Sequence, residues 1–180
     1  MMVAEKRSEA SYILNQVVGN KLFPEVNEYE LERVLFFLSQ YPLMKMRMHD
    51  YEQYEQDLNE TAIEGEVSRR ISNEEYYANK TANTVILREK RLWVYERYSW
   101  MTKQIDRSYN LIIDKDIQKA EEEKKAIRHR YLEGHSRSTM FSFFPRGISQ
   151  RTIERRLHSA IIKMANNLKC NGVLEVEWKF

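Results

Sequence analysis

The side chains best suited to bind a polar ligand gather at the start of one segment near the carboxyl-terminal end of the chain. Their spacings of one, three and four residues place them on one side of a helix: Gln150, Arg151, Glu154, Arg155 and His158. In the major groove of DNA, arginine forms paired hydrogen bonds with guanine, and glutamine does so with adenine. We therefore interpret the stripe as the outer face of a recognition helix. A solvated polar face on an ordinary amphipathic helix is the alternative.

The surrounding sequence predicts the helix that positions this stripe. Ser149 directly precedes it and is a favourable N-cap residue, so the helix is expected to begin near Gln150. Pro145 and Gly147 supply the turn before it. Apolar residues recur at three- and four-residue steps on the opposite side and form the expected core face: Ile153, Leu157, Ala160, Ile161, Met164 and Leu168.

Two further helices are expected before this turn. One continues through residues 121–132 and stops at Gly134, because glycine is common just after a helix. A short one falls within SRSTMFSFFP, residues 136–145. Together they predict a helix-turn-helix domain over residues 116–170. Hydroxyl and guanidinium groups beside the stripe are candidates for holding DNA phosphates: Ser136, Arg137, Ser149, Thr152 and Arg156.

The motif GISQRTIERRLHSAI, preceded at a suitable distance by IRHRYLEG, resembles the fourth-region helix-turn-helix of bacterial sigma factors. More particularly, residues 92–168 resemble phage and prophage regulators of the ArpU and RinA type, which carry this module at the end of a helical protein. The resemblance implies a transcriptional regulator that acts on late phage genes. One departure lies in the first helix of the motif, where Met140, Phe141, Phe143 and Phe144 replace the family's small residue and leucine.

Charge is distributed unevenly along the chain. The net charge of +2 combines +9 in residues 124–169 with −6 in residues 1–123 and −1 in the last ten residues. In the basic segment, 11 Lys and Arg face only two acids, Glu133 and Glu154. A basic module on an acidic body is the pattern expected if one end of the protein meets nucleic acid. A merely solvated basic face is the alternative.

Residues 1–60 are expected to form an N-terminal helical region. A short helix is predicted within residues 10–18, and a second one begins after Asn27, which can cap it, and ends at Tyr41 and Pro42. Residues 43–58 resume a looser apolar pattern, which suits a third helix packed on the second. The stretch 61–73 contains Gly65 and few large apolar residues, so we interpret it as a linker.

Residues 74–115 are assigned to one long central helix, because glycine and proline are absent from 74–114. Its apolar seam consists of Leu87, Val94, Tyr98, Met101, Ile105 and Ile112. We favour packing of this seam within the chain. Packing on a second copy of the chain is the alternative. Apolar and charged side chains alternate from Leu174 to Phe180, which predicts a half-buried β-strand over residues 171–180. That strand would pair with a second copy in a homodimer, or lie against the helical body.

Several classes of site are not supported by the sequence. The single cysteine, Cys170, allows no internal disulfide, and His49, His129, His135 and His158 show no metal-ligand spacing. No phosphate-binding loop and no acid, base or nucleophile motif is present. No apolar run could serve as a signal peptide or a membrane span. We therefore expect a cytoplasmic protein that is not an enzyme and has no metal, cofactor or membrane partner.

The leading interpretation is an all-α, sequence-specific DNA-binding regulator of transcription, whose partner is double-stranded DNA. A sigma-like variant adds RNA polymerase as the partner of the acidic body. An alternative from another class is the small DNA-recognition subunit of a phage packaging motor, which is a helical oligomer. An adaptor that binds an acidic protein is a third interpretation. A homodimer stays open beside a monomer, because the long helix and the strand could each pair with a second copy.

Overall fold

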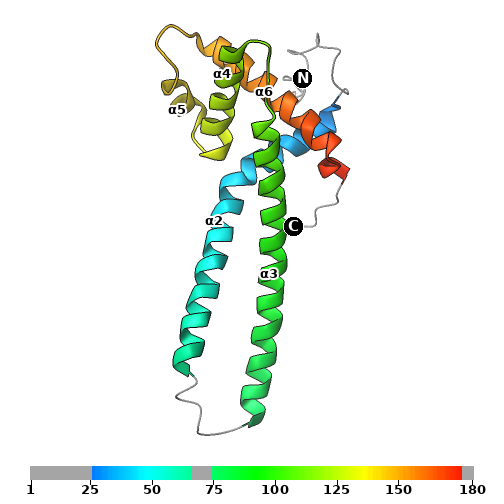
Figure 1. Cartoon of the computed structure of the whole chain (residues 1–180), viewed down its shortest axis with the longest axis vertical. Coiled ribbons are helices and arrows are strands. Elements are labelled where there is room, and N and C mark those ends of the chain that lie inside the picture. Colours follow the sequence, from blue (N-terminus) through cyan, green and yellow to red (C-terminus); the bar gives the residue numbers. More distant parts are fainter. Residues whose placement is uncertain (1–25, 66–73, 176–180) are drawn as a thin grey trace, which may run out of the picture. The chain divides into compact units, whose positions relative to one another are not determined.

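The described part of the chain is built from helices (Figure 1). This computed structural model describes residues 26–65 and 74–175, and side chains over 26–57 and 85–175. The described α-helices are α2 (Glu28–Gly65), α3 (Glu74–Asn110), α4 (Ile117–Ile127), α5 (Arg137–Ser142) and α6 (Gln150–Cys170). A π-helical turn, η1 (Arg128–Leu132), continues α4, and a 3-10 turn, η2 (Val173–Glu175), follows α6. These described residues contain no β-strand, so the predicted all-α class is confirmed for them.

Helix α2 begins where the sequence predicts it but ends much later. Asn27 Oδ1 accepts a hydrogen bond from Glu30 N at 2.8 Å, and Glu30 Oε2 accepts one from Asn27 N at 2.9 Å, which forms a capping box. The predicted end at Pro42 is wrong, because Pro42 lies inside the helix. Proline removes one backbone hydrogen bond, but Leu38 and Met44 on either side of it are both buried. This packing keeps the chain helical across Pro42.

The two long helices change the predicted boundaries. Because α2 extends to Gly65, residues 61–65 of the predicted linker are helical, while residues 66–73 lie outside the described residues. The helix expected at residues 10–18 also lies outside them. Helix α3 agrees with the predicted long central helix, although it ends at Asn110 instead of residue 115. The chain turns there because Asp116 already caps α4, its side chain accepting from the backbone N of Lys119 at 3.2 Å.

The chain divides into two compact units. Unit 1 comprises residues 1–42 and 103–180, and unit 2 comprises residues 43–102. In unit 2 the second part of α2 and the first part of α3 run side by side (Figure 1), and Tyr51 stacks on Tyr95 with ring centroids 4.8 Å apart. The Tyr95 hydroxyl also donates to Glu52 Oε1 at 2.8 Å. Aromatic and polar contacts therefore join the two helices of this unit.

Unit 1 has a core to which all of its α-helices contribute. Its fully buried side chains include Leu31, Val34, Leu38, Ile105, Ile127, Met140, Ile161, Met164 and Leu168. Six apolar residues predicted for the inner face of α6 are all buried, so that prediction is confirmed. Side chains that lie far apart in the sequence thus meet in one core, which holds α6 by its apolar side.

The described part of the predicted C-terminal strand is not a strand. Val173–Glu175 form η2, in which Glu175 N donates to Gly172 O at 3.3 Å, so the hydrogen bonding is local. Val173 and Leu174 are buried, and an Arg33 guanidinium nitrogen donates to Leu174 O at 2.6 Å. Residues 176–180 lie outside the described residues. The sequence left two placements open for this segment, pairing with a second copy or packing against the helical body. Its described part packs against the helical body.

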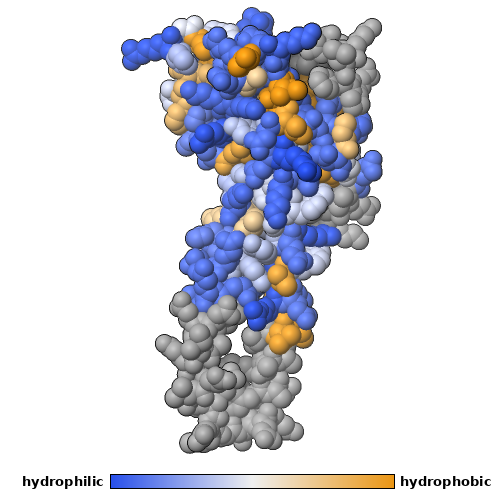
Figure 2. Space-filling model, viewed as in Figure 1, coloured by the Kyte–Doolittle hydropathy of each residue, from blue (hydrophilic) through white to orange (hydrophobic). Residues whose placement is uncertain are grey.

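The surface is mostly hydrophilic in the view of Figure 2, with smaller hydrophobic areas on each unit. Along the predicted apolar seam of α3, Leu87 is 53% exposed, whereas Ile105 and Ile112 are fully buried. The seam is therefore packed within the chain only toward its end. In the part of the chain that the structure describes, no helix combines the length and apolar character needed to cross a membrane.

Candidate nucleic-acid interface

Helix α6 begins at the residue that the sequence predicts. Ser149 has an extended backbone conformation, and its Oγ accepts from the backbone N of Thr152 at 3.1 Å, which makes it the N-cap. Thr152 Oγ1 lies 2.9 Å from Ser149 Oγ, so both hydroxyls take part in the cap. Upstream, Gly147 has a φ of 116°, which glycine adopts without steric cost. This turn and cap together set the start of α6.

The first two turns of α6 have a buried and an exposed side. Ile153 and Leu157 are 2% exposed, whereas Gln150, Arg151 and Arg155 are exposed. Among the described residues, neither arginine forms an ion pair. We call Gln150, Arg151 and Arg155 the reading face. It presents two guanidinium groups and an amide at a helix N-terminus, where the backbone N–H groups also favour an anion.

Two arginines predicted to hold phosphates are paired with carboxylates. Arg137 Nε lies 3.4 Å from Glu154 Oε1, an ion pair that joins α5 to α6. Arg156 Nε donates to Glu122 Oε2 at 2.9 Å, which joins α6 to α4. The sequence places Glu154 on the outward stripe, and its carboxylate offsets the charge of Arg137. These side chains tie the helices together, so contact with DNA would compete with that role.

His158 does not lie on the outward stripe. Its side chain is 1% exposed, so the prediction that it faces outward is wrong. The physical reason is that α6 is enclosed on more than one side from its third turn onward, where its buried residues are Leu157, His158, Ala160, Ile161, Met164, Ala165, Asn166 and Leu168. An enclosed helix cannot enter a groove. The surface available for reading DNA is therefore limited to the first two turns.

Helix α5 is the short helix that the sequence predicts before the turn. Ser136 Oγ accepts from the backbone N of Thr139 at 3.1 Å, so Ser136 caps α5. Met140 and Phe144 are buried. Two of the residues that depart from the sigma-type pattern thus supply core contacts for this unit.

The connection between α5 and α6 carries a basic residue that the sequence interpretation missed. It spans residues 143–149, which is longer than the roughly 3–4-residue turn of the simplest helix-turn-helix motif. Arg146 lies in it, is exposed, and forms no ion pair with any described residue. The signal was present in the sequence, because Arg146 stands between the turn residues Pro145 and Gly147. Arg146 thus adds a third guanidinium without an ion pair to a described residue, in the turn that leads into α6.

A buried ionic network anchors α6 to α4. Glu123 is fully buried; its Oε2 accepts from Lys163 Nζ at 2.6 Å and its Oε1 from Ser159 Oγ at 2.7 Å. Lys163 Nζ also donates to Asp114 Oδ2 at 2.8 Å, and Lys119 Nζ lies 2.7 Å from the same oxygen. Hydrogen bonds from Lys119 and Lys163 hold the pKa of Asp114 well below its usual range. The network fixes the middle of α6 and, with it, the position of its first turns.

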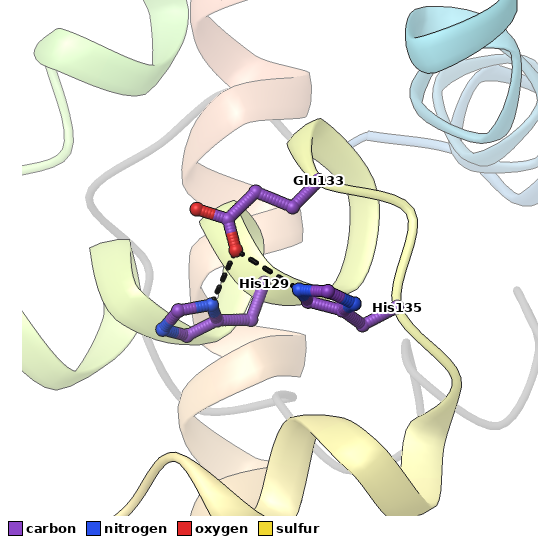
Figure 3. Close-up of side chains that lie close together, drawn as sticks. All are labelled: His129, Glu133 and His135. Carbon is purple, nitrogen blue, oxygen red and sulfur yellow. Dashed lines mark hydrogen bonds and ion pairs between the residues drawn. The ribbon is translucent and has the colours of Figure 1, made fainter.

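Two histidines and a glutamate lie together where η1 leads toward α5 (Figure 3). His129 Nδ1 is 2.6 Å and His135 Nε2 is 3.3 Å from the same oxygen, Glu133 Oε2. The hydrogen bond from His129 is the main cause that lowers the pKa of Glu133, and the hydrogen bond from Arg128 adds to it. The sequence spacing predicts no metal site, but the fold brings three possible ligand atoms together. We call His129, Glu133 and His135 the His-Glu-His cluster.

Comparisons of the chain with protein-family models, with curated proteins and with solved structures found no match.

Proposed function

We propose that this chain is a sequence-specific DNA-binding regulator of transcription that reads base edges with the reading face of α6. The observation that carries the proposal is that Arg151 and Arg155 are exposed and lack an acidic partner among the described residues, at the capped start of a helix. Each guanidinium can donate two hydrogen bonds to guanine, and Gln150 can pair similarly with adenine. An entry of α6 by its first two turns resembles the docking of recognition helices in general.

Phosphate contacts would come from groups around the reading face. Arg146 and the free backbone N–H groups in the first turn of α6 are the best placed, because neither has a carboxylate partner. Five other residues remain predicted phosphate contacts: Ser136, Arg137, Ser149, Thr152 and Arg156. Their contribution is expected to be smaller, since the hydroxyls already cap helices and both guanidinium groups already pair with glutamates.

The resemblance to ArpU and RinA regulators narrows the proposal to late-gene activation in a phage or prophage. It rests on the GISQRTIERRLHSAI motif, whose N-cap, helix start and inner face coincide with Ser149 and α6. The charge distribution also supports DNA binding, because residues 124–169 carry a net charge of +9. A basic module of this kind steers a protein toward DNA.

Selection of bound sequences from a random pool of double-stranded DNA tests the proposal. We expect one enriched site, which the full chain binds roughly 10³-fold or more above random DNA. The affinity should fall with salt by about 0.9 log units per log unit of salt for each phosphate engaged. A chain that enriches no sequence, or whose binding is insensitive to salt, would contradict the proposal.

Three further measurements separate the proposal from its rivals. Co-purification with RNA polymerase core would favour the sigma-like variant, in which the acidic part of the chain docks on polymerase. A ring-sized oligomer in sedimentation would favour the packaging-motor subunit. Salt-dependent binding to an acidic protein, with no enriched DNA site, would favour the adaptor.

A further inference from the structure

The His-Glu-His cluster lies in a short stretch with unusual backbone geometry. His129 is part of the π-helical turn η1, Glu133 follows it, and Gly134 has a φ of 73° that reverses the chain toward His135. His135 N then donates to His129 O at 3.0 Å, which brings the two histidines together. Single π-helical turns in proteins occur frequently at functional sites. The backbone thus provides the juxtaposition that the sequence spacing hides.

The three side chains converge on one point. Glu133 Oε2 lies between His129 Nδ1 and His135 Nε2, and the three atoms all lie within 4.8 Å of one another. Figure 3 shows both imidazole rings directed toward this one carboxylate oxygen. In a tetrahedral zinc site with bonds of about 2.0–2.1 Å, neighbouring ligand atoms are about 3.3 Å apart. Glu133 Oε2 and His135 Nε2 already have that spacing at 3.3 Å, and Glu133 Oε2 and His129 Nδ1 are closer at 2.6 Å.

Neighbouring groups hold the ligands in place. The ring of Phe143 stacks on His129 with centroids 3.9 Å apart and also contacts His135 at 5.1 Å. Arg128 Nε donates to Glu133 Oε1 at 2.8 Å, which turns the other carboxylate oxygen toward the imidazoles. Metal ligands are commonly oriented by such outer contacts. The side chain of His129 is only 14% exposed, so the cluster is also partly shielded from water.

We propose that His129, Glu133 and His135 form a binding site for a divalent metal ion of the zinc class. Two imidazole nitrogens and one carboxylate oxygen are a ligand set that Zn²⁺ accepts, with water in the fourth position. Hard ions such as Mg²⁺ and Ca²⁺ prefer oxygen ligands and are disfavoured by two imidazoles. The ion would replace the direct contact between His129 Nδ1 and Glu133 Oε2.

A bound ion would cross-link η1 to the turn that leads into α5. Phe143, which packs on both imidazoles, is the C-cap residue of α5, so the ion would stiffen both ends of this short helix. Ligands that bind only the folded state raise its stability. The metal site does not depend on the DNA-binding proposal, because it predicts zinc binding by the chain alone.

Zinc chloride titrated into the full chain by calorimetry tests the site. Cys170 is an exposed thiol that could bind zinc itself, so Cys170→Ser is the parent for every variant. We expect one zinc ion per chain in the parent, and loss of that binding in His129→Ala, Glu133→Gln and His135→Ala. His49→Ala, which removes an exposed histidine outside the cluster, should bind as the parent does. Zinc should raise the melting temperature of the parent and of His49→Ala only.

Circular dichroism checks that each variant folds. If His129→Ala fails that check, His135→Ala decides, because its side chain is 38% exposed and tolerates truncation. The proposal is overturned if the parent binds no zinc, or if a folded His135→Ala variant binds it with unchanged affinity. If the chain binds zinc but enriches no DNA sequence from the random pool, the metal site stands and the proposed function fails.

Discussion

The arginines of unit 1 differ in what surrounds their guanidinium groups. Arg137 and Arg156 each pair with a glutamate on a neighbouring helix, whereas Arg151 and Arg155 pair with no described residue. An exposed, unpaired guanidinium keeps its donors in the planar arrangement that recognises guanine or phosphate. At the scale of single residues, this difference selects the residues that can bind a new partner without breaking an existing contact.

The buried carboxylate of Glu123 gives a stability prediction. Glu123→Ala removes one partner of Lys163, whose side chain is only 14% exposed, and leaves Asp114 as its remaining partner. Breaking a buried ion pair costs about 3–5 kcal/mol of folding stability. Because Lys163 still pairs with Asp114 in this variant, the loss should lie near the low end of that range. Urea unfolding should therefore show a loss of about 3 kcal/mol. Glu121→Ala, an exposed change on the same helix, is the matched control, and equal losses in both variants would refute the role of the network.

Asp114 gives a pH prediction. The pKa of its carboxyl is lowered in the folded state by Lys119 and Lys163, so its contribution to stability is present above its unfolded pKa of about 3.9. That contribution is lost as the pH falls below this value toward the lower folded pKa. Asp114→Asn should be less stable at neutral pH and should lose less stability between about pH 4 and pH 2 than the wild type. Urea unfolding over a pH series measures both, and parallel curves would contradict the prediction.

Among the elements, α6 is the one that the sequence predicts best. Its cap, its first residue and its buried face all follow from local chemistry, since Ser149, Gln150 and the apolar spacing need no information from elsewhere in the chain. Pro42 shows where local reasoning fails. Proline usually ends a helix, but in α2 buried side chains on both sides outweigh the lost hydrogen bond. The described part of the predicted strand, Val173–Glu175, is a 3-10 turn with local hydrogen bonding, while residues 176–180 lie outside the described residues.

The cap of α6 allows stability to be separated from DNA binding. Ser149→Ala should cost about 1 kcal/mol of folding stability, because it removes the acceptor for the Thr152 N–H group. Ser149→Asp should keep the cap and the stability, since aspartate caps as well as serine and suits the helix N-terminus. Its negative charge should nevertheless weaken DNA binding. Unfolding and DNA titrations of both variants measure this, and unchanged affinity in Ser149→Asp would place the DNA elsewhere.

At the scale of the whole molecule, the sequence could not show which residues from distant segments meet. The burial of His158 depends on how many neighbours enclose α6, and the convergence of His129 and His135 depends on a π-turn and a positive φ at Gly134. Pairing of Arg156 with Glu122 is likewise a property of the α4–α6 packing. The charge asymmetry, in contrast, is a sum over the sequence and needed no structure.

That charge asymmetry predicts a salt effect that belongs to the chain as a whole. Arg146→Ala should weaken binding to every DNA sequence alike and reduce the slope of log affinity against log salt by about 0.9, because one phosphate contact is lost. Arg107→Ala is the control, since it removes the same charge from an exposed position on α3. DNA titrations over a range of salt concentrations measure the slopes. A smaller slope in both variants would mean that only net charge matters.

We propose that the first two turns of α6 read base edges. The most direct measurement compares the wild type, Arg151→Ala and Arg107→Ala on a selected DNA site and on versions of that site changed at one base pair at a time. We expect Arg151→Ala to lose about 1–3 kcal/mol of discrimination at a single base pair and to keep the other preferences, with Arg107→Ala like the wild type. An Arg151→Ala variant with the affinity and base preferences of the wild type would contradict the claim.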